Sequence, residues 1–379
     1  MIGVDRGDEP EALVLERERQ LARAELRGRL PGREDIKGYD PPAVRQQLCA
    51  QQHEKCAYCE KGIEQEAYPI EHFRPKLGGQ DVQWDQRQGE EPPLDLKEVV
   101  WAKDPAPYWW LAWTWENLFY SCPTCNSQKY KANRFPLRQG SPRLLKMSLP
   151  AVAEQALLLN PADVDPFDHI RFVPDREENN WRAIGLTLEG RWTILVLGLN
   201  RTGLRTNRKK HVKTLKENYS LKHATDALGA GDAEALQVYW RDAVATLLAP
   251  EQDYLALTRC VLDDSFPAEV RERYGLDLPR PSFAARRIQH PLLRCRPDLA
   301  GLSRNLEMRL RALGERTESA ELDELLVALC RERSCMLEEL CALLRLGAQY
   351  LQQSYLTRLC GGDRPMLRLD PTTGRYCGT

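Results

Sequence analysis

The chain has 379 residues, and its composition, with 42% hydrophobic residues, fits a globular protein of two or three domains with filled cores. Its 54 Lys and Arg residues nearly cancel its 55 Asp and Glu residues, which excludes a uniformly basic protein and confines any nucleic-acid-binding charge to local segments. No apolar run approaches the roughly 20 residues that span a bilayer, and the amino-terminal residues lack the basic-then-apolar order of a signal peptide. We therefore expect a cytoplasmic protein with no membrane partner.

Helices are expected at the start of the chain. Residues 9–28 and 40–55 both carry apolar residues at helical spacing, and the second segment begins with Asp-Pro-Pro. From residue 56 to residue 136 this periodicity fades and aromatic residues accumulate, which is typical of a small metal-bound unit with a long internal loop. Four tryptophans of this unit could stack on unpaired bases, but we favour packing in the core for most of them: Trp109, Trp110, Trp113 and Trp115.

Two Cys-x-x-Cys pairs, Cys56 with Cys59 and Cys122 with Cys125, stand out among the twelve cysteines. Two such pairs suit one Zn²⁺ ion bound by four thiolates in a closed site, which leaves no open position for a substrate and is therefore structural. A redox dithiol is the alternative, but it belongs beside a βαβ pattern, and none is present here. We expect most of the other cysteines to be small buried hydrophobic residues.

The middle of the chain mixes strands and helices. Three strand-like segments, with a turn at Glu189-Gly190, predict a small β element at residues 169–175, 181–190 and 191–200. A basic helix follows from residue 201, and residues 231–263 predict two helices joined at Ala249-Pro250. We therefore place residues 150–278 in one domain with the cysteine unit.

The carboxyl-terminal part has a different organisation. Residues 279–316 contain several prolines and arginines, which predicts a linker. Residues 317–379 then predict three helices and a hairpin, at residues 319–332, 336–346, 347–360 and 366–378. This is the order of a winged helix, a domain that could read a major groove or dock a protein. Its presumed third helix offers Gln349, Tyr350, Gln352, Gln353, Tyr355 and Arg358 for such contacts.

Between and around the cysteine pairs lie three short motifs, Ile70-Glu71-His72-Phe73-Arg74-Pro75-Lys76, Trp115-Glu116-Asn117-Leu118 and Cys125-Asn126-Ser127-Gln128-Lys129. Their order resembles that of the HNH, or ββα-metal, endonucleases, and the motifs are similar to those of the PtuB-like HNH nucleases associated with Septu and retron anti-phage systems. The resemblance covers residues 40–140 well and 150–265 more loosely. It implies an α+β fold in which a zinc-stapled ββα-metal core, residues 50–140, is embedded in a mostly helical domain, residues 1–278.

The resemblance also implies roles for single residues. Phosphodiester hydrolysis needs an activated water and a cation beside the scissile phosphate. His72 is then the general base, Glu71 and Asn126 are oxygen ligands of one catalytic Mg²⁺ or Mn²⁺, and Asn117 orients the loop that carries His72. We expect Asn126 and Lys129 on one face of a helix that begins at Pro123. Glu71 and Asn126 replace the more frequent Asp and His, which leaves the metal preference open.

Two basic segments are candidates for phosphate contacts. Residues 117–153 contain six Lys or Arg and no acidic residue, and residues 201–222 contain eight Lys or Arg against one Glu. A solvated helix face or an internal ion pair is the alternative for each of these side chains. The predicted nucleic-acid contacts are Arg74, Lys76, Lys129, Lys131, Arg134, Arg205, Arg208 and Lys209.

The sequence thus predicts a metal-dependent HNH endonuclease that cuts nucleic acid, with DNA favoured over RNA. The resemblance implies a role as effector of an anti-phage defence system, controlled by an ATPase partner of the ABC- or SMC-like PtuA type. Two alternatives stay open at this point. One is a non-catalytic, zinc-stapled DNA-binding adaptor, and the other is a tRNA-cleaving toxin nuclease.

Overall fold

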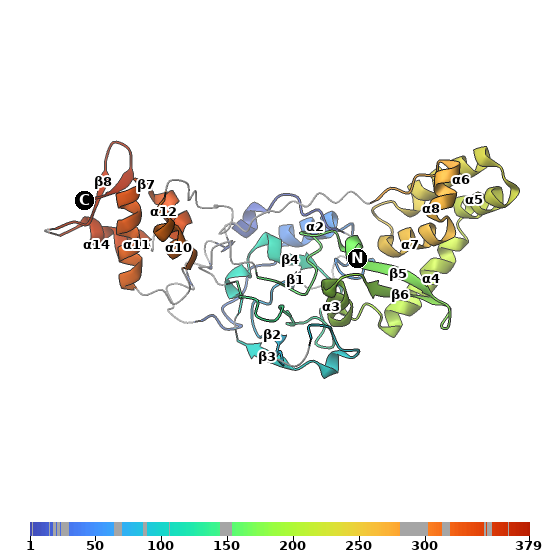
Figure 1. Cartoon of the computed structure of the whole chain (residues 1–379), viewed down its shortest axis with the longest axis horizontal. Coiled ribbons are helices and arrows are strands. Elements are labelled where there is room, and N and C mark those ends of the chain that lie inside the picture. The colour runs from blue at the N-terminus through green and yellow to red at the C-terminus, as the bar shows by residue number, and fades with distance from the viewer. Residues whose placement is uncertain are drawn as a thin grey trace. The chain divides into compact units, whose positions relative to one another are not determined.

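The computed structural model divides the chain into two compact units, residues 1–139 with 156–287 (unit 1) and residues 140–155 with 288–379 (unit 2). It has the mixed α+β composition that the sequence predicts (Figure 1). None of its described helices is long and apolar enough to cross a membrane. The structure describes residues 1, 3–14, 16–17, 20, 23, 30–63, 70–85, 89–105, 107–144, 154–280, 302–312, 319–344, 346, 351–362 and 364–379.

Unit 1 combines three antiparallel strand pairs with a set of helices. The strand pairs are β1 (Ile70–His72) with β4 (Leu118–Tyr120), β2 (Gly79–Val82) with β3 (Trp101–Asp104), and β5 (Ile170–Asp175) with β6 (Asn180–Gly185). The helices are α2 (Pro42–Gln51), α3 (Leu188–Leu197), α4 (Thr202–Lys216), α5 (Tyr219–Ala230), α6 (Ala233–Leu247), α7 (Leu255–Ser265) and α8 (Ala268–Tyr274). Short 3₁₀ turns occur at Leu96–Glu98, Trp109–Leu111, Trp115–Asn117 and Pro166–Asp168.

An aromatic core surrounds the β1–β4 pair. Each of these strands has only three residues, and all six residues are buried, so packing must supply the rigidity that so short a ladder lacks. The Phe73 ring meets the Phe135 ring edge to face at 5.3 Å, and the Arg6 guanidinium lies 3.8 Å from the centroid of the Phe119 ring. The prediction of core packing is confirmed for the four tryptophans, which are all buried: Trp109, Trp110, Trp113 and Trp115.

Residues 188–197 form helix α3, and the prediction of a strand at residues 191–200 is wrong. The predicted turn at Glu189-Gly190 is the first turn of this helix. The Thr187 hydroxyl accepts a hydrogen bond from the Gly190 N–H, and Gly198 ends the helix in the left-handed conformation with φ +57°. The segment is rich in β-branched and aromatic residues, which favour strands, but α3 contacts β6 and buries side chains such as Trp192, and this packing overrides that preference.

The other elements of this region agree with the sequence. Strands β5 and β6 occupy the first two predicted segments, α4 is the predicted basic helix, and α6 and α7 flank the predicted joint at Ala249-Pro250. The Asn218 and Asp232 side chains cap the amino-terminal ends of α5 and α6. Helix α4 contacts β6, α7 contacts β5, and α5 lies along α6 (Figure 1).

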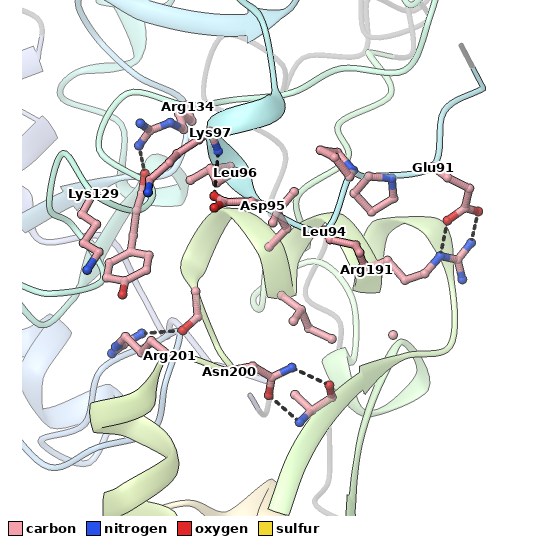
Figure 2. A pocket seen from close by; sticks show the side chains of 18 residues that line it. Glu91, Leu94, Asp95, Leu96, Lys97, Lys129, Arg134, Arg191, Asn200 and Arg201 are labelled. Atoms are coloured by element: carbon pink, nitrogen blue, oxygen red, sulfur yellow. Dashed lines mark hydrogen bonds and ion pairs between the residues drawn. The ribbon is translucent and has the colours of Figure 1, made fainter.

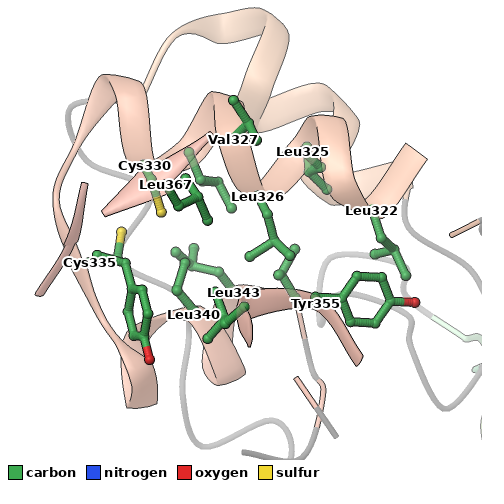
Figure 3. Close-up of a cluster of buried hydrophobic side chains, with 14 of the residues drawn as sticks. Leu322, Leu325, Leu326, Val327, Cys330, Cys335, Leu340, Leu343, Tyr355 and Leu367 are labelled. Carbon is green, nitrogen blue, oxygen red and sulfur yellow. The ribbon is translucent and has the colours of Figure 1, made fainter. Parts of the chain in front are cut away.

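Unit 2 has a leucine-rich core of its own, between helices and a small sheet (Figure 3). The sheet has the order β7-β9-β8 and is antiparallel. The predicted hairpin is confirmed as β8 and β9, whereas β7, with two residues, was too short to be predicted. The elements are α10 (Arg304–Ala312), α11 (Ser319–Glu332), β7 (Cys335–Met336), α12 (Leu337–Leu344), a π-helical turn (Gln352–Leu356), α14 (Thr357–Cys360), β8 (Leu367–Asp370) and β9 (Arg375–Gly378).

Helix α10 lies inside the stretch 279–316 that the sequence predicts as a linker. Its Leu306 and Leu310 side chains are buried in the core of unit 2, so this part of the stretch is a packed element. The arginines around these leucines hid the apolar stripe in the sequence. Residues 281–301 and 313–316 of the predicted linker lie outside the described residues, as do Gln349 and Tyr350 of the predicted third helix.

Candidate functional site

The four cysteines of the two Cys-x-x-Cys pairs converge on one buried point. Their sulfur atoms all lie within 4.8 Å of one another, and the Cys59 and Cys122 sulfurs are 3.8 Å apart. A tetrahedral Zn²⁺ with bonds of about 2.3 Å to each sulfur requires sulfur–sulfur distances of this size. The Cys125 N–H also donates to the Cys122 sulfur, at 3.4 Å, which shapes a knuckle around the second pair. The cluster can therefore hold one structural zinc ion.

A positive charge lies beside this cluster. The Arg201 guanidinium donates to the Cys125 sulfur at 3.5 Å. Burial alone would lower the pKa of Arg201, but the nearby Cys125 and Cys59 thiolates outweigh burial and raise it. Four thiolates around one Zn²⁺ carry a net charge of −2, so Arg201 neutralises part of the charge that this buried site would otherwise leave unbalanced.

His72, at the end of β1, is held by hydrogen bonds at both ring nitrogens. Its Nε2 lies 3.0 Å from the Ala112 carbonyl oxygen, and its Nδ1 lies 2.9 Å from the Lys76 Nζ. Because a carbonyl can only accept, Nε2 carries the proton and Nδ1 accepts from Lys76. The Tyr39 ring meets the imidazole edge on at 4.6 Å. Burial, and then the positive charge of Lys76, holds the pKa of His72 well below its usual value, so the imidazole is neutral.

Glu71 is buried and forms an ion pair with Lys131, whose side chain is also fully buried. The Lys131 ammonium donates a second hydrogen bond to the His72 carbonyl oxygen, at 2.9 Å. Burial raises the pKa of Glu71, and the positive charges of Lys131 and Lys76 offset only part of this effect. Lys131, predicted to contact nucleic acid, is in this arrangement an internal counter-charge, and its contact with nucleic acid stays a prediction.

Asn117 joins the segment after His72 to the segment before β4. Its Oδ1 accepts from the Arg74 N–H at 2.7 Å, and its Nδ2 donates to the Arg74 carbonyl at 3.0 Å and to the Leu111 carbonyl at 3.1 Å. The amide group thus satisfies its acceptor and both of its donors inside the protein. This geometry is the one expected of a residue that orients the loop next to His72.

Residues 123–130 form a series of turns, and the helix predicted to begin at Pro123 is not present. The chain reverses after the knuckle, so that the Lys131 N–H donates to the Cys125 carbonyl at 3.2 Å. This reversal is what carries the Lys131 side chain inward to Glu71, which a continuing helix would prevent. Among the described residues, no hydrogen bond joins the Asn126 side chain to Glu71 or His72.

Glu71 and Asn126 stay the predicted ligands of a catalytic Mg²⁺ or Mn²⁺, and in this arrangement one of them has another partner. The Glu71 carboxylate is engaged by Lys131, and a metal ion at the same oxygens would meet two ammonium groups, Lys131 and Lys76. Within the described ranges, the four cysteines are the one group of three or more His, Cys, Asp or Glu side chains close enough to share an ion.

The remaining predicted nucleic-acid contacts divide by exposure. Arg208 is buried, with its guanidinium 4.5 Å from the centroid of the Phe172 ring, so it is not exposed for the contact that the sequence predicts. Arg205 is paired with Asp175 and Glu178, and Arg134 donates to the backbone carbonyls of Gln128 and Tyr130. Arg74 is half-buried beside Phe73, whereas Lys129 and Lys209 are exposed. Lys146 of the first basic segment lies outside the described residues.

Sequence reasoning missed one neighbour of His72. Lys76 lies four residues after His72, within a predicted motif. Tyr39 lies 33 positions before His72, outside every motif of the sequence. The Lys76 ammonium lies 4.2 Å from the centroid of the Tyr39 ring, so Tyr39, Lys76 and His72 form one contact group. No spacing in the sequence indicates Tyr39, because its contact depends on the tertiary fold.

Comparison with known proteins finds one similarity. No family model and no solved structure matches the chain. The chain is 31% identical over 186 residues to the Septu protein PtuB of Bacillus mycoides (strain KBAB4). The alignment covers 48% of this chain and 55% of the relative, so the chain spans about half the length of that curated protein. The resemblance expected from the motifs is confirmed to this extent: over about half of its length, this chain is similar to the Septu protein PtuB.

Proposed function

We propose that the chain is an HNH-type nuclease that hydrolyses phosphodiester bonds with His72 as the general base. The observation that carries this proposal is the state of the imidazole. Its Nε2–H is fixed on the Ala112 carbonyl, and its Nδ1 keeps the lone pair that a base needs. Because the pKa of His72 lies well below the usual value, the base stays unprotonated at neutral pH.

Hydrolysis would follow from this geometry. His72 Nδ1 takes a proton from a water molecule, the water oxygen forms the new bond to phosphorus, and the bond to the leaving oxygen breaks as that oxygen takes a proton from solvent. Lys76 must give up its hydrogen bond to Nδ1 as the water arrives. Its ammonium, whose pKa burial lowers to about 8, is then free to neutralise the phosphate. Asn117 keeps the His72 loop in place.

The metal requirement is part of the proposal. Zinc at the four cysteines would be structural, as the buried, closed cluster supports. The resemblance assigns one Mg²⁺ or Mn²⁺ to Glu71 and Asn126. Binding there requires Lys131 to release Glu71, so we propose that the arrangement with the Glu71–Lys131 ion pair is the resting form of the enzyme.

The relative's name suggests the biological setting. We propose that the chain acts in an anti-phage defence system of the Septu type, cutting DNA in preference to RNA and controlled by an ABC- or SMC-like ATPase partner of the PtuA type. Unit 2 would be a winged helix, since its helices precede a hairpin and β7 pairs with the last strand. Its role would be to dock DNA or the partner protein.

The direct test is cleavage of plasmid DNA and RNA by the wild-type protein and by His72→Ala, in Mg²⁺, in Mn²⁺ and in EDTA. Loss of the base should slow cleavage by about 100-fold or more, without loss of zinc. His53→Ala is the matched control, because this histidine is exposed. Equal cleavage by the wild-type and His72→Ala proteins would overturn the proposal. Cleavage of tRNA alone would favour the toxin alternative.

One observation favours the non-catalytic alternative. The Glu71–Lys131 ion pair leaves the predicted metal ligand engaged, as expected of a core that binds nucleic acid without cutting it. Salt-dependent DNA binding without turnover in any divalent metal, with or without an ATPase partner, would identify such an adaptor.

A further inference from the structure

Unit 1 contains a pocket of about 720 Å³ that has no part in the proposed nuclease chemistry (Figure 2). Its walls are the segment 91–97, the carboxyl-terminal end of α3, and the residues just after the zinc knuckle. Glu71, His72 and Asn117 are not among the lining residues. The volume lies within the range of sites that bind small organic molecules.

The pocket carries an excess of positive charge. Five basic and two acidic side chains line it, but the Arg191 guanidinium binds both oxygens of Glu91, at 2.7 and 2.6 Å, and this pair is neutral. Four basic residues and Asp95 then remain, a formal net charge of +3, although one of the four, Arg201, is also the counter-charge of the cysteine cluster. Within the described part of the chain, the Lys97 and Lys129 ammonium groups have no hydrogen bond or ion pair, and both side chains are exposed. The four basic residues are Lys97, Lys129, Arg134 and Arg201.

The opposite side of the pocket is apolar. Leu94 is fully exposed there, and Pro92, Pro93, Ile194 and Leu195 also line the wall. In Figure 2 the four basic side chains lie on one side of the pocket, and Leu94 lies with the Glu91–Arg191 pair toward the other. A fully exposed leucine costs free energy in water, which a ligand with a flat apolar face would relieve.

One cation on the basic side of the pocket, Arg201, is held in place before any ligand arrives, whereas Lys97 and Lys129 are exposed. The Arg201 guanidinium donates to the Leu197 and Gly198 carbonyls and to the Cys125 sulfur, so the zinc knuckle and the end of α3 hold it from both directions. Gly198 lets the Tyr130 ring lie against the helix end, where a side chain would overlap the ring at 2.1 Å. Such pre-organisation lowers the entropic cost of binding.

We propose that this pocket binds a nucleoside phosphate. The phosphate would lie between Lys97 and Lys129, and the base would lie against Leu94 and the apolar wall. A nucleoside phosphate joins a flat ring and a compact anion in one molecule of suitable size, whereas an acidic peptide would match the charge and leave Leu94 in water. The ligand could be a free nucleotide or one nucleotide of a single strand. This inference goes beyond the nuclease proposal, because no step of it uses His72.

The test is binding, measured by calorimetry with the full-length, zinc-loaded His72→Ala protein so that no probe is cut. The probes are AMP, adenosine, inorganic phosphate, a short 5′-phosphorylated oligothymidylate and a polyglutamate peptide. Binding of AMP indicates a free nucleotide as the source, and binding of the oligonucleotide without AMP indicates a strand. Since the base is already removed, failure of the nuclease proposal cannot affect this result.

Lys97→Ala with Lys129→Ala should weaken nucleotide binding by about tenfold or more, and Leu94→Asp should do the same, because charged hydrogen bonds and apolar burial each contribute at this level. Lys103→Ala, on exposed β3 outside the pocket, is the matched control and should leave affinity within about twofold. The proposal is overturned if neither AMP nor the oligonucleotide binds, or if the control weakens binding as much as the pocket variants. Tighter binding of polyglutamate than of either nucleotide probe would also overturn it, in favour of a peptide site.

Discussion

The buried Lys131 side chain connects two segments of the site. The ion pair with Glu71 and the hydrogen bond to the His72 carbonyl tie the turn after the zinc knuckle to strand β1. Removing one partner of a buried ion pair strongly destabilises the folded protein, because the other charge stays buried and unpaired. Replacing both partners by neutral groups changes the stability little. Substitutions of Glu71 and Lys131 should therefore have strongly non-additive effects on the free energy of unfolding.

Lys131→Met should lower the free energy of unfolding by about 3–5 kcal/mol, because it leaves the Glu71 carboxylate buried without a counter-charge. The double variant Glu71→Gln with Lys131→Met should recover most of this loss. Urea titrations of the wild type, both single variants and the double variant measure the coupling. Additive losses in the double variant would show that the two side chains act independently.

His211 gives unit 1 a defined response to acid. Its Nε2 lies 2.8 Å from the Thr258 hydroxyl, and burial lowers its pKa, against the opposing charges of Asp253 and Glu60. A histidine with a lowered pKa in the folded state binds protons more tightly when unfolded. Its contribution to stability is therefore complete above the unfolded pKa of about 6.5, and it is lost as the pH falls through that value.

Between about pH 7.5 and pH 5.5, the wild type should lose more stability than His211→Gln, which keeps a polar group but does not titrate. Urea midpoints at both pH values measure the difference. Comparison of the two proteins at each pH also removes the effect of acid on the cysteine cluster, which both share. Parallel losses in the two proteins would contradict the assignment.

Among the elements, helix α3 depends on how it ends. Gly198 has φ +57°, a conformation that costs a residue with a side chain about 1–2 kcal/mol, and an added Cβ would also overlap the Tyr130 ring. Gly231, at the end of α5, has φ +71° and open space around it. A comparison of these two glycines therefore separates the cost of the left-handed backbone conformation, which both share, from the cost of the steric overlap with Tyr130, which only residue 198 has.

Gly198→Ala should therefore destabilise the protein by clearly more than Gly231→Ala, which should cost about 1 kcal/mol. Thermal and urea unfolding of the two variants measure the difference. The Tyr130→Ala background should remove most of the excess at residue 198, since the collision is with that ring. Equal losses of stability in Gly198→Ala and Gly231→Ala would show that the Tyr130 ring moves aside without a measurable cost in free energy.

The elements that the sequence predicted correctly are those with a local signal. Apolar spacing and capping residues indicated α2, α4, α6, α7 and α11, turn residues indicated the β8–β9 hairpin, and ligand spacing indicated the cysteine cluster. Helix α10 was missed because its arginines hid the apolar stripe, whereas the other two failures, α3 and the turns at residues 123–130, are segments where contacts distant in sequence decide the outcome. Burial of Trp192 and the inward path of Lys131 leave no periodic trace.

At the scale of the whole molecule, loss of the zinc site should unfold unit 1 without unfolding unit 2. The four cysteines join two segments of unit 1 whose nearest members, Cys59 and Cys122, are 63 positions apart in the sequence, whereas unit 2 has its own leucine-rich core. All nine tryptophans lie in unit 1, so their fluorescence reports on that unit alone.

Cys122→Ser, or removal of metal by a chelator, should shift the tryptophan-detected unfolding of unit 1 to much lower temperature, because zinc binding contributes directly to folding. A second transition in circular dichroism, from unit 2, should remain. Cys377→Ser, on β9 of unit 2, is the matched control and should keep zinc and the unit 1 transition. A zinc-free Cys122→Ser protein with unchanged fluorescence unfolding would contradict the role of the metal.

The position of Arg201 links the zinc site to the pocket. One guanidinium touches the Cys125 sulfur and also lines the pocket, so the metal and a ligand in the pocket share a single side chain. Thermodynamic coupling between two sites is reciprocal: if bound zinc raises the affinity of the pocket for its ligand, the bound ligand raises the affinity of the cysteine cluster for zinc by the same factor. A bound nucleotide would then slow the release of the ion, and metal exchange would become a readout of the nucleotide concentration around the protein.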